Sequence, residues 1–338
     1  MASLPEITER IKKTKQSWLV TGCAGFIGSH LVEFLLRSNQ RVVGVDNFLT
    51  GSRENISYLQ SLPNSEAFSF IEGDITNFEL CEKATKGIDF VLHQAALGSV
   101  PRSVKAPLPS HDNNVTGTIN VFHAAIENKV KKLVFASSSS VYGDDPNLPK
   151  VEEQIGKVLS PYAATKKICE VYAEAFSQVY DFKFVGLRYF NVFGPRQNPQ
   201  GPYAAVIPLW ISKLLANEST FINGDGKTSR DFTFIDNVIA VNILSAISDS
   251  ESSNNIILNV ACGKGVDLTS LHSSIKTHLE TIKEIKIEDK LEFRDFRAGD
   301  IRHSLANIEK AKNAIGYKPL VNIDDGLRKT VEWYLNQT

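Results

Sequence analysis

The stretch Thr21-Gly22-Cys23-Ala24-Gly25-Phe26-Ile27-Gly28 decides the fold that we expect for this chain. It ends an apolar run at residues 18–21 and leads into residues 29–38, where apolar side chains recur at helical spacing. Three glycines between a strand and a helix permit a tight turn, the close approach of a pyrophosphate and close packing of the helix. The N-terminus of that helix then faces the phosphates. Although the spacing G-x-x-G-x-x-G differs from the commoner G-x-G-x-x-G, the strand before it and the helix after it predict a dinucleotide site.

Short runs rich in β-branched or aromatic residues recur along the chain, and stretches with helical spacing separate them. The runs are residues 18–21, 41–45, 68–72, 90–93, 132–136, 183–187 and 256–260. This alternation is typical of a parallel sheet with crossover helices. Because the runs are apolar almost throughout, both faces of the sheet should be covered by helices. We therefore expect an α/β fold with a doubly wound, Rossmann-type parallel sheet of about seven strands.

The regular alternation ends near Arg188, where Gly- and Pro-rich segments begin. We expect a second, smaller lobe of mixed α/β structure for substrate, built from about residues 191–236 plus 263–338. The dinucleotide-binding domain then comprises residues 1–190 plus about 237–262. Ligands of such sheets bind at the carboxyl ends of the strands, which is where the two lobes should face each other.

Composition and charge exclude several classes of protein. With 37 Lys and Arg against 38 Asp and Glu, the net charge is -1, and no basic run offers a surface for nucleic acid. The four cysteines form no C-x-x-C pair and the histidines show no ligand spacing, so we expect small buried thiols and no metal site. The charged N-terminal segment differs from a signal peptide, and no stretch reaches the roughly 18 apolar residues of a membrane span. We expect a cytoplasmic enzyme.

Polar or small residues follow the next strands at the edge where a dinucleotide would lie. Asp46 closes the second strand, 18 residues after Gly28, where a carboxylate accepts hydrogen bonds from the adenosine ribose. A carboxylate there repels a 2′-phosphate, so we predict NAD rather than NADP as the cofactor. Gly73-Asp74-Ile75 follows the third strand, and His93-Gln94-Ala95-Ala96 follows the fourth. His93 itself should be packed or hydrogen-bonded.

A tyrosine and a lysine occupy one face of a predicted helix. Ser160-Pro161 is a favourable helix start, and Tyr162 and Lys166 are four residues apart in that helix. A free tyrosine ionises near pH 10, so a tyrosine that acts as a base needs a nearby cation such as Lys166. The strand at residues 132–136 runs into four serines, where a hydroxyl can bond the reacting oxygen.

Taken together, T-G-C-A-G-F-I-G, D-N, G-D-I, H-Q-A-A, S-S-S-S-V-Y-G and S-P-Y-A-A-T-K resemble the extended short-chain dehydrogenase/reductase family over the whole chain. The resemblance implies that Tyr162 is the catalytic base, that Lys166 binds the nicotinamide ribose and that Ser138 completes the triad. The expected cofactor contacts are Gly22, Gly25, Phe26, Ile27, Gly28, Asp46, Asn47, Asp74, Ile75, Gln94, Ala95, Ala96, Tyr162, Lys166 and Tyr189.

Residues 189–196 and 229–232 resemble the segments of that family that bind a nucleotide sugar. Asn191, Arg230 and Arg297 would hold the UDP pyrophosphate, the arginines by charge-assisted hydrogen bonds. The expected substrate contacts are Ser99, Ser138, Ser139, Ser140, Asn191, Ala205, Val206, Asn223, Arg230, Arg297, Asp300 and Ser304. The resemblance also suggests a homodimer through helices around residues 112–128 and 162–180.

The residues after Ser138 separate two reactions of this family. In the similar 4,6-dehydratases an acidic pair stands at the positions of Ser139 and Ser140 and eliminates water. Without carboxyl groups there, the reaction should stop at reversible oxidation of C4, so we predict epimerisation of a UDP-hexose with bound NAD.

The segments at residues 98–103, 203–208 and 293–304 resemble a subgroup of bacterial UDP-N-acetylglucosamine 4-epimerases. In epimerases restricted to non-acetylated sugars, a tyrosine is typical at the position of Ser304. The smaller Ser304 leaves room for an acetamido group, so we expect UDP-N-acetylglucosamine and UDP-N-acetylgalactosamine as substrates, with UDP-glucose and UDP-galactose as further candidates.

Other functions stay open at this point. A UDP-glucuronate 4-epimerase or decarboxylase needs a cation facing the sugar C6, for which Arg102 is the candidate. A non-catalytic NAD-binding sensor has no need of Ser138, Tyr162 and Lys166 together. Gly226-Lys227-Thr228 resembles the end of a P-loop, but Phe221 stands where its first glycine belongs, so we predict a turn.

Overall fold

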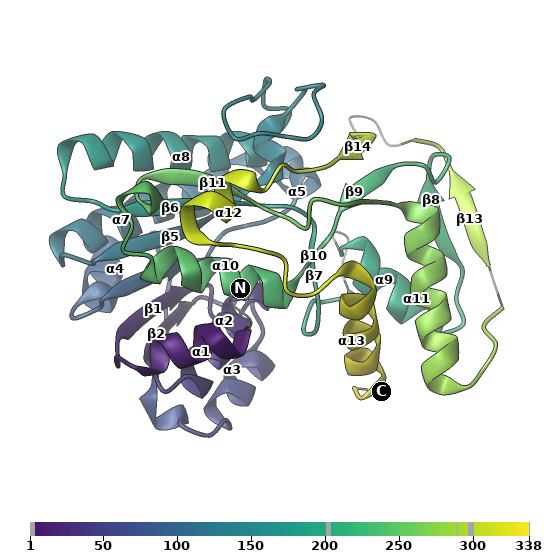
Figure 1. Ribbon diagram of the computed structural model, residues 1–338, viewed down its shortest axis with the longest axis horizontal. Helices are drawn as coiled ribbons and strands as arrows, with labels where there is room; N and C mark the ends of the chain where they lie inside the picture. Colours follow the sequence, from purple (N-terminus) through teal and green to yellow (C-terminus); the bar gives the residue numbers. More distant parts are fainter. Residues whose placement is uncertain (1–3, 201–203, 289, 297–300, 338) are drawn as a thin grey trace.

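The computed structural model describes residues 4–200, 204–288, 290–296 and 301–337 (Figure 1). Within these residues the largest sheet has seven parallel strands in the order β11-β6-β5-β4-β1-β2-β3. The strands are β1 (Ser17–Thr21), β2 (Arg41–Asp46), β3 (Phe68–Glu72), β4 (Phe90–His93), β5 (Lys132–Ser138), β6 (Phe184–Tyr189) and β11 (Ile256–Val260). This sheet confirms the predicted doubly wound α/β fold. Its chain order reverses between β1 and β4, where folds of this type bind ligands.

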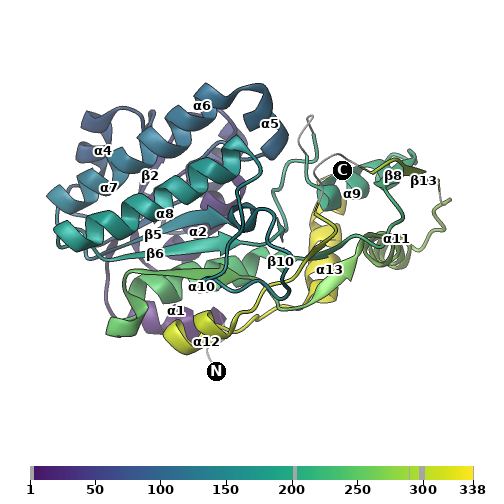
Figure 2. The same cartoon turned by 90° about the horizontal axis from the view of Figure 1, so that it is seen from above.

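Helices cover both faces of the sheet (Figure 2). One face carries α1 (Leu4–Lys12), α2 (Phe26–Arg37) and α10 (Ile235–Ile247), and the other carries α4 (Phe78–Thr85), α7 (Gly117–Glu127) and α8 (Pro161–Val179). Successive residues of β1 serve the two faces, because Trp18 and Val20 pack among the first group and Leu19 among the second. The middle of the strand, Trp18 to Val20, is therefore apolar on both faces, and the two hydrophobic cores lie on opposite sides of one sheet.

Two predicted strands extend beyond their apolar runs. β5 continues through Ser137 and Ser138, and β6 includes Arg188 and Tyr189. Ser137 and Arg188 are polar, yet both are buried and both hydrogen-bond to the buried carboxylate of Glu170 on α8. A pattern of apolar residues misses such positions because a buried partner, rather than an apolar side chain, satisfies them.

Smaller sheets and helices form the right-hand part of Figure 1. They comprise the pair β8 (Thr220–Asn223) and β13 (Leu291–Arg294), the triple β12 (Gly265–Asp267), β9 (Ser229–Asp231) and β14 (His303–Ser304), and the helices α9 (Val206–Leu215), α11 (Leu268–Lys283) and α13 (Ile323–Leu335). A further pair, β7 (Val192–Phe193) and β10 (Thr233–Phe234), lies next to the main sheet. The helix α12 (Glu309–Ile315) returns to the main sheet, where it packs against β11 and α10.

Short helices complete the described chain: α3 (Arg53–Gln60), α5 (Val100–Lys105), α6 (Pro107–His111), η1 (Ser65–Ala67), η2 (Asp112–Thr116), η3 (Ser139–Tyr142) and η4 (Glu251–Ser253).

Asp231 joins β9 of the smaller part to the end of the main sheet. Its carboxylate accepts hydrogen bonds from the backbone N–H groups of Cys262 and Gly263, at 2.9 and 3.0 Å, directly after β11. Burial raises the pKa of Asp231 to about 6, although these hydrogen bonds oppose the shift. The side chain therefore fixes β9, and with it Arg230, against the main sheet.

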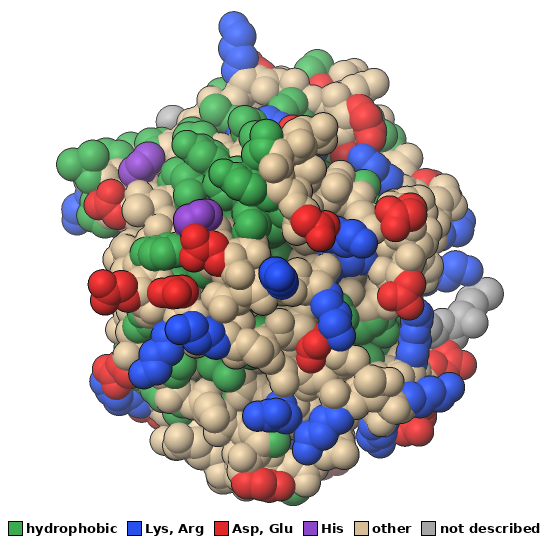
Figure 3. Space-filling model, turned by 90° about the vertical axis from the view of Figure 1, so that its left-hand side faces the viewer, with side chains coloured by type: hydrophobic (Ala, Val, Ile, Leu, Met, Phe, Trp, Pro, Cys, Tyr) green, Lys and Arg blue, Asp and Glu red, His purple; other side chains and the backbone are tan. Residues whose placement is uncertain are grey.

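Apolar side chains are exposed along α8 and the two short helices beside it. Val171 and Val179 of α8 are 50% and 70% exposed, and Leu108 of α6 is 74% exposed. Figure 3 shows hydrophobic side chains gathered on the side of the molecule that carries α4, α7 and α8. Exposed apolar groups that gather in this way mark a surface suited to contact with another protein.

Candidate functional site

The glycine turn connects β1 to α2 in the way that its sequence predicts. Gly22 adopts a φ of +70°, and a Cβ on it would lie 2.8 Å from the backbone nitrogen of Ala95 after β4. A Cβ on Gly28 would overlap the carbonyl oxygen of Gly22. Only glycine therefore allows α2 to begin this close to β1, with its N-terminus directed at the carboxyl edge of the sheet.

A cavity of about 320 Å³ lies at this edge, between the glycine turn and the ends of β2, β3 and β4. Most of the predicted cofactor residues line it, namely Gly22, Gly25, Phe26, Ile27, Gly28, Asp46, Asn47, Ile75, Gln94, Ala95 and Ala96. The cavity is also lined by residues that are not among the predicted cofactor contacts, namely Val45, Leu49, Thr50, Leu97, Gly98 and Asn113. A turn without side chains, a helix N-terminus and a carboxylate are the groups that a dinucleotide requires, so the cavity fits one.

Backbone groups hold Asp46 at the cavity wall. Its carboxylate accepts hydrogen bonds from the N–H groups of Ala24 and Phe48, at 2.9 and 2.8 Å. Burial raises the pKa of Asp46 above its ordinary value, and these hydrogen bonds oppose the shift. Each carboxylate oxygen can accept a further hydrogen bond, so a ribose hydroxyl can still be bound.

Two predicted cofactor residues, Asp74 and Tyr189, form hydrogen bonds with residues that line the cavity but do not line it themselves. The carboxylate of Asp74 accepts hydrogen bonds from the Asn47 amide and the Thr76 backbone, each at 2.8 Å. The hydroxyl of Tyr189 lies 3.1 Å from the amide oxygen of Gln94 and is buried. Neither residue lines the cavity, so in this structure they support Asn47 and Gln94, which do.

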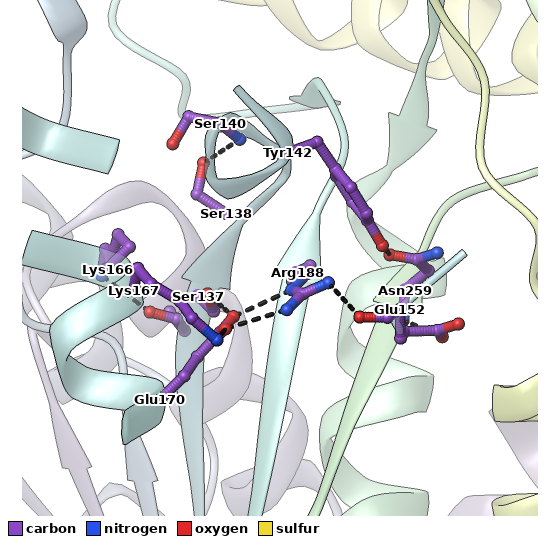
Figure 4. Close-up of polar contacts among 11 residues, drawn as sticks. Ser137, Ser138, Ser140, Tyr142, Glu152, Lys166, Lys167, Glu170, Arg188 and Asn259 are labelled. Carbon is purple, nitrogen blue, oxygen red and sulfur yellow. Dashed lines mark hydrogen bonds and ion pairs between the residues drawn. The ribbon is translucent and has the colours of Figure 1, made fainter. Parts of the chain in front are cut away.

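The Tyr–Lys pair lies on the first turns of α8, against the end of β5. The Ser160 hydroxyl caps the helix by accepting a hydrogen bond from the Ala163 N–H at 3.1 Å, as predicted. The ammonium of Lys166 is 6.0 Å from the ring centre of Tyr162 and donates to the carbonyl of Ala136 at 2.7 Å. Because Ala136 precedes Ser138 by two residues in β5, this bond brings the helix to the strand end that carries Ser138 (Figure 4).

The serine segment after β5 forms the helix η3. Ser138 accepts a hydrogen bond at its hydroxyl from the Ser140 N–H at 3.2 Å. The Ser140 hydroxyl oxygen is buried and has no hydrogen-bond partner among the described residues. An unpaired buried hydroxyl is a group that a ligand can satisfy.

A second cavity, of about 210 Å³, lies in the smaller part of the molecule. Four predicted substrate residues line it: Asn191, Val206, Asn223 and Arg230. The cavity is also lined by residues that are not among the predicted substrate contacts, namely Ala204, Leu209, Trp210, Phe221, Ile222, Phe232 and Leu268. An aromatic and amide lining beside one guanidinium suits a base linked to an anionic group.

The other predicted substrate residues that the structure describes are not among those that line this cavity. Ser304 of β14 stands opposite Arg230 in the parallel pairing with β9. Ser99 adopts a φ of +94° and caps α5 by accepting a hydrogen bond from the Arg102 N–H at 3.2 Å. Ala205 precedes the first residue of α9. Arg297 and Asp300 lie outside the described residues.

His93 is held by two threonines in the core. Its Nδ1 lies 2.6 Å from the Thr21 hydroxyl and its Nε2 lies 2.9 Å from the Thr118 hydroxyl. Burial, with the charge of Lys166, lowers its pKa to about 3. The prediction of a hydrogen-bonded histidine is confirmed.

In the part of the chain that the structure describes, no cluster of three or more His, Cys, Asp or Glu is arranged to hold a metal ion. The same residues include no helix with the length and apolar character needed to cross a membrane. Cys23, Cys81 and Cys169 are buried free thiols, whereas Cys262 is half-buried.

The glycine turn yields a direct test. Gly28→Ala should abolish dinucleotide binding, because the added methyl displaces the Gly22 carbonyl and with it the turn. Gly265→Ala is the matched control, since its Cβ would meet Ser229 only at 3.7 Å. The measurement is the nucleotide released when each purified protein is denatured. The cavity assignment is wrong if Gly28→Ala retains as much nucleotide as the unmodified protein.

Comparisons with known proteins agree with this geometry. Residues 18–261 match the model of the NAD dependent epimerase/dehydratase family. The chain is 36% identical over 320 residues to the putative UDP-glucose 4-epimerase of Methanocaldococcus jannaschii, which covers 94% of this chain and 98% of that protein.

Two solved structures are similar over nearly the whole chain. The UDP-N-acetylglucosamine 4-epimerase from Methanobrevibacter ruminantium, in complex with UDP-N-acetylmuramic acid, has a TM-score of 0.88 and 42% identity, covering 96% of this chain and 100% of that one. The UDP-glucuronic acid 4-epimerase from Bacillus cereus, in complex with UDP-glucuronic acid and NAD, has a TM-score of 0.85 and 31% identity, covering 95% and 100%. The predicted family and the predicted cofactor are both confirmed: the chain belongs to the NAD-dependent epimerase/dehydratase family, and NAD is its cofactor.

Proposed function

We propose that this enzyme reversibly epimerises C4 of UDP-N-acetylglucosamine to give UDP-N-acetylgalactosamine. The observation that carries the proposal is the contact of Lys166 with β5, which brings the Tyr162 helix to a strand end that bears only hydroxyl groups. Tyr162 supplies a proton acceptor, and Ser139 and Ser140 offer no carboxyl group for elimination. The similarity to the M. ruminantium enzyme, at 42% identity, supports the acetylated substrate.

The residues of the chain have separate tasks in this reaction. Bound between the glycine turn and Asp46, NAD would supply reversible hydride transfer, so that the reaction would proceed without net redox change. Tyr162 takes the proton of the 4-hydroxyl group and later gives it back. Ser138 hydrogen-bonds the same oxygen, and the positive charge of Lys166 favours the ionised tyrosine and binds the nicotinamide ribose.

Epimerisation at one carbon requires that the hexose turn over while the nucleotide stays bound. We assign the nucleotide to the second cavity, with Asn191, Arg230 and Arg297 on the pyrophosphate. Asp231 supports this grip because it anchors β9 to the main sheet. We assign the acetamido group to the room that the small side chain of Ser304 would leave in place of a tyrosine, and to the hydroxyls of Ser99, Ser139 and Ser140. On this assignment residues 1–190 plus about 237–262 form the NAD-binding domain. About residues 191–236 plus 263–338 form the lobe that binds the nucleotide sugar.

A UDP-glucuronate 4-epimerase is the second candidate function. Arg102 lies on α5 next to Ser103, whose hydroxyl accepts a hydrogen bond from the Tyr162 N–H at 3.0 Å. The cation of Arg102 is therefore carried by α5, the helix that also contacts the backbone of the proposed base Tyr162. The lower identity of 31% to the B. cereus enzyme favours the acetylated substrate over glucuronate.

We further propose a homodimer in the cytoplasm, formed through α7, α8 and the short helices beside them. The exposed Val171 and Val179 of α8 supply an apolar surface that a second copy would cover.

Replacing the base tests the mechanism. Tyr162→Phe should lower kcat by about 10²-fold or more, because general acid–base steps contribute roughly 10² to 10⁴. The retained NAD and the binding of the UDP-sugar should be unchanged. Tyr172→Phe is the matched control on the same helix and should keep its activity. A Tyr162→Phe enzyme with unmodified kcat would contradict the proposed mechanism.

Enlarging the side chain at Ser304 tests the substrate. Ser304→Tyr should lower kcat/KM for the acetylated pair far more than for UDP-glucose and UDP-galactose, because a close-packed pocket does not absorb a ring. Ser304→Ala adds no volume and serves as the control. If the folded tyrosine variant turns over UDP-N-acetylglucosamine as before, Ser304 does not line the sugar pocket.

A charge on the exposed face of α8 tests the dimer. Val171→Asp should give a monomer by size-exclusion chromatography with light scattering, because a carboxylate in an apolar interface is not paired. Ile282→Asp on α11, where the residue is 38% exposed, is the control and should leave the mass unchanged. Equal masses for the Val171→Asp variant and the unmodified protein at a dimer value would exclude this interface.

A further inference from the structure

We infer that Ser137, Glu170 and Arg188, together the Glu170 clamp, are positioning residues that fix the strand end and the helix carrying Ser138, Tyr162 and Lys166. The inference rests on the proposed function, because it takes those three residues as the catalytic group. None of the clamp residues lines either cavity.

The clamp is a buried, bidentate ion pair with a third partner (Figure 4). The Nε and Nη2 atoms of Arg188 donate to the two carboxylate oxygens of Glu170, each at 2.9 Å. The Ser137 hydroxyl donates to the same carboxylate at 2.7 Å. The side chains of Glu170 and Arg188 are 0% and 2% exposed. The Nζ atom of Lys167 lies 3.3 Å from the Oε2 atom of Glu170.

Each member stands beside a proposed catalytic residue. Ser137 precedes Ser138, and in a strand neighbouring side chains point to opposite faces, so the bond to Glu170 directs the Ser138 hydroxyl the other way. Glu170 follows Lys166 by one turn of α8. Arg188 lies on β6, which pairs with β5 at Ser137. The clamp therefore fixes both the rotation of α8 and its height along β5.

A buried ion pair is a costly way to join these elements. Apolar side chains of similar volume hold a helix to a sheet at least as well, so stability alone does not explain the pair. A guanidinium fork on a carboxylate fixes orientation as well as distance. Burial raises the pKa of Glu170, but the hydrogen bond and charge of Arg188 outweigh it and hold that pKa below its ordinary value. The carboxylate is therefore ionised and the fork is maintained.

Arg188 also contacts the helix η3 of the serine segment. Its guanidinium carbon lies 4.9 Å from the ring centre of Tyr142, the last residue of η3. Its Nη1 atom donates to the carbonyl of Glu152 at 3.0 Å. The Tyr142 hydroxyl in turn donates to Asn259 of β11 at 2.6 Å. Arg188 thus contacts both α8, through Glu170, and η3, the helix that follows Ser138, through Tyr142.

The test compares turnover with binding. Ser137→Ala should lower kcat about tenfold, the effect of losing one hydrogen bond to a charged group, and Glu170→Gln should lower it further. In both variants the KM for the UDP-sugar and the retained NAD should stay within about twofold of the unmodified enzyme. The double variant should be slowed by less than the two single effects combined, because Ser137 and Glu170 belong to one hydrogen-bond network.

Leu36→Ala controls for lost stability, since Leu36 is buried at the far end of α2. It should be destabilised and keep its kcat. If Glu170→Gln does not fold, Ser137→Ala decides. The inference is overturned if folded clamp variants keep the unmodified kcat, or if they lose NAD or raise KM while kcat is kept. An active Tyr162→Phe enzyme overturns the proposed function instead.

Discussion

The constraint on which the cofactor edge depends is the contact between Gly28 and the carbonyl of Gly22, which leaves no space for a side chain. It places the first turn of α2 against the end of β1, so the helix N-terminus opens onto the carboxyl edge of the sheet. Gly22 itself lies against Ala95, which ties the turn to the neighbouring strand β4. The cofactor cavity, the reversal of strand order and the approach of α8 to β5 are all arranged around this edge.

Two kinds of interaction then organise the edge. Apolar packing covers both faces of the sheet, while a small number of buried polar groups sets the angles between elements. Asp231 anchors β9 to the loop after β11, and Glu170 joins α8 to β5 and β6. The pKa values of these two carboxyl groups are shifted in opposite directions. Burial raises the pKa of Asp231, whereas Arg188 holds the pKa of Glu170 below its ordinary value. Packing thus builds the fold, and these polar anchors join β9 and α8 to the main sheet.

The main sheet could be predicted because each strand is an apolar run between helical stretches, and the glycine turn because its spacing has a mechanical cause. The ends of β5 and β6 could not, since Ser137 and Arg188 are buried through a carboxylate that is remote in sequence. The places of Asp74 and Tyr189 near strand ends also did not show what they bond. Asp74 bonds to Asn47, and Tyr189 bonds to Gln94. The second cavity was only partly foreseen, because Trp210, Phe221 and Leu268 come from three elements with no common motif. The two-residue strand β14 exists only through its pairing with β9.

In the proposed mechanism this enzyme inverts C4 by removing the C4 hydrogen and returning that same hydrogen to the other face. The most direct measurement uses UDP-N-acetylglucosamine with deuterium at C4, followed by chromatographic separation and mass analysis of the product. The expected product is UDP-N-acetylgalactosamine that keeps its deuterium in ordinary water. Loss of the deuterium to solvent, or no interconversion of the two sugars, would contradict it.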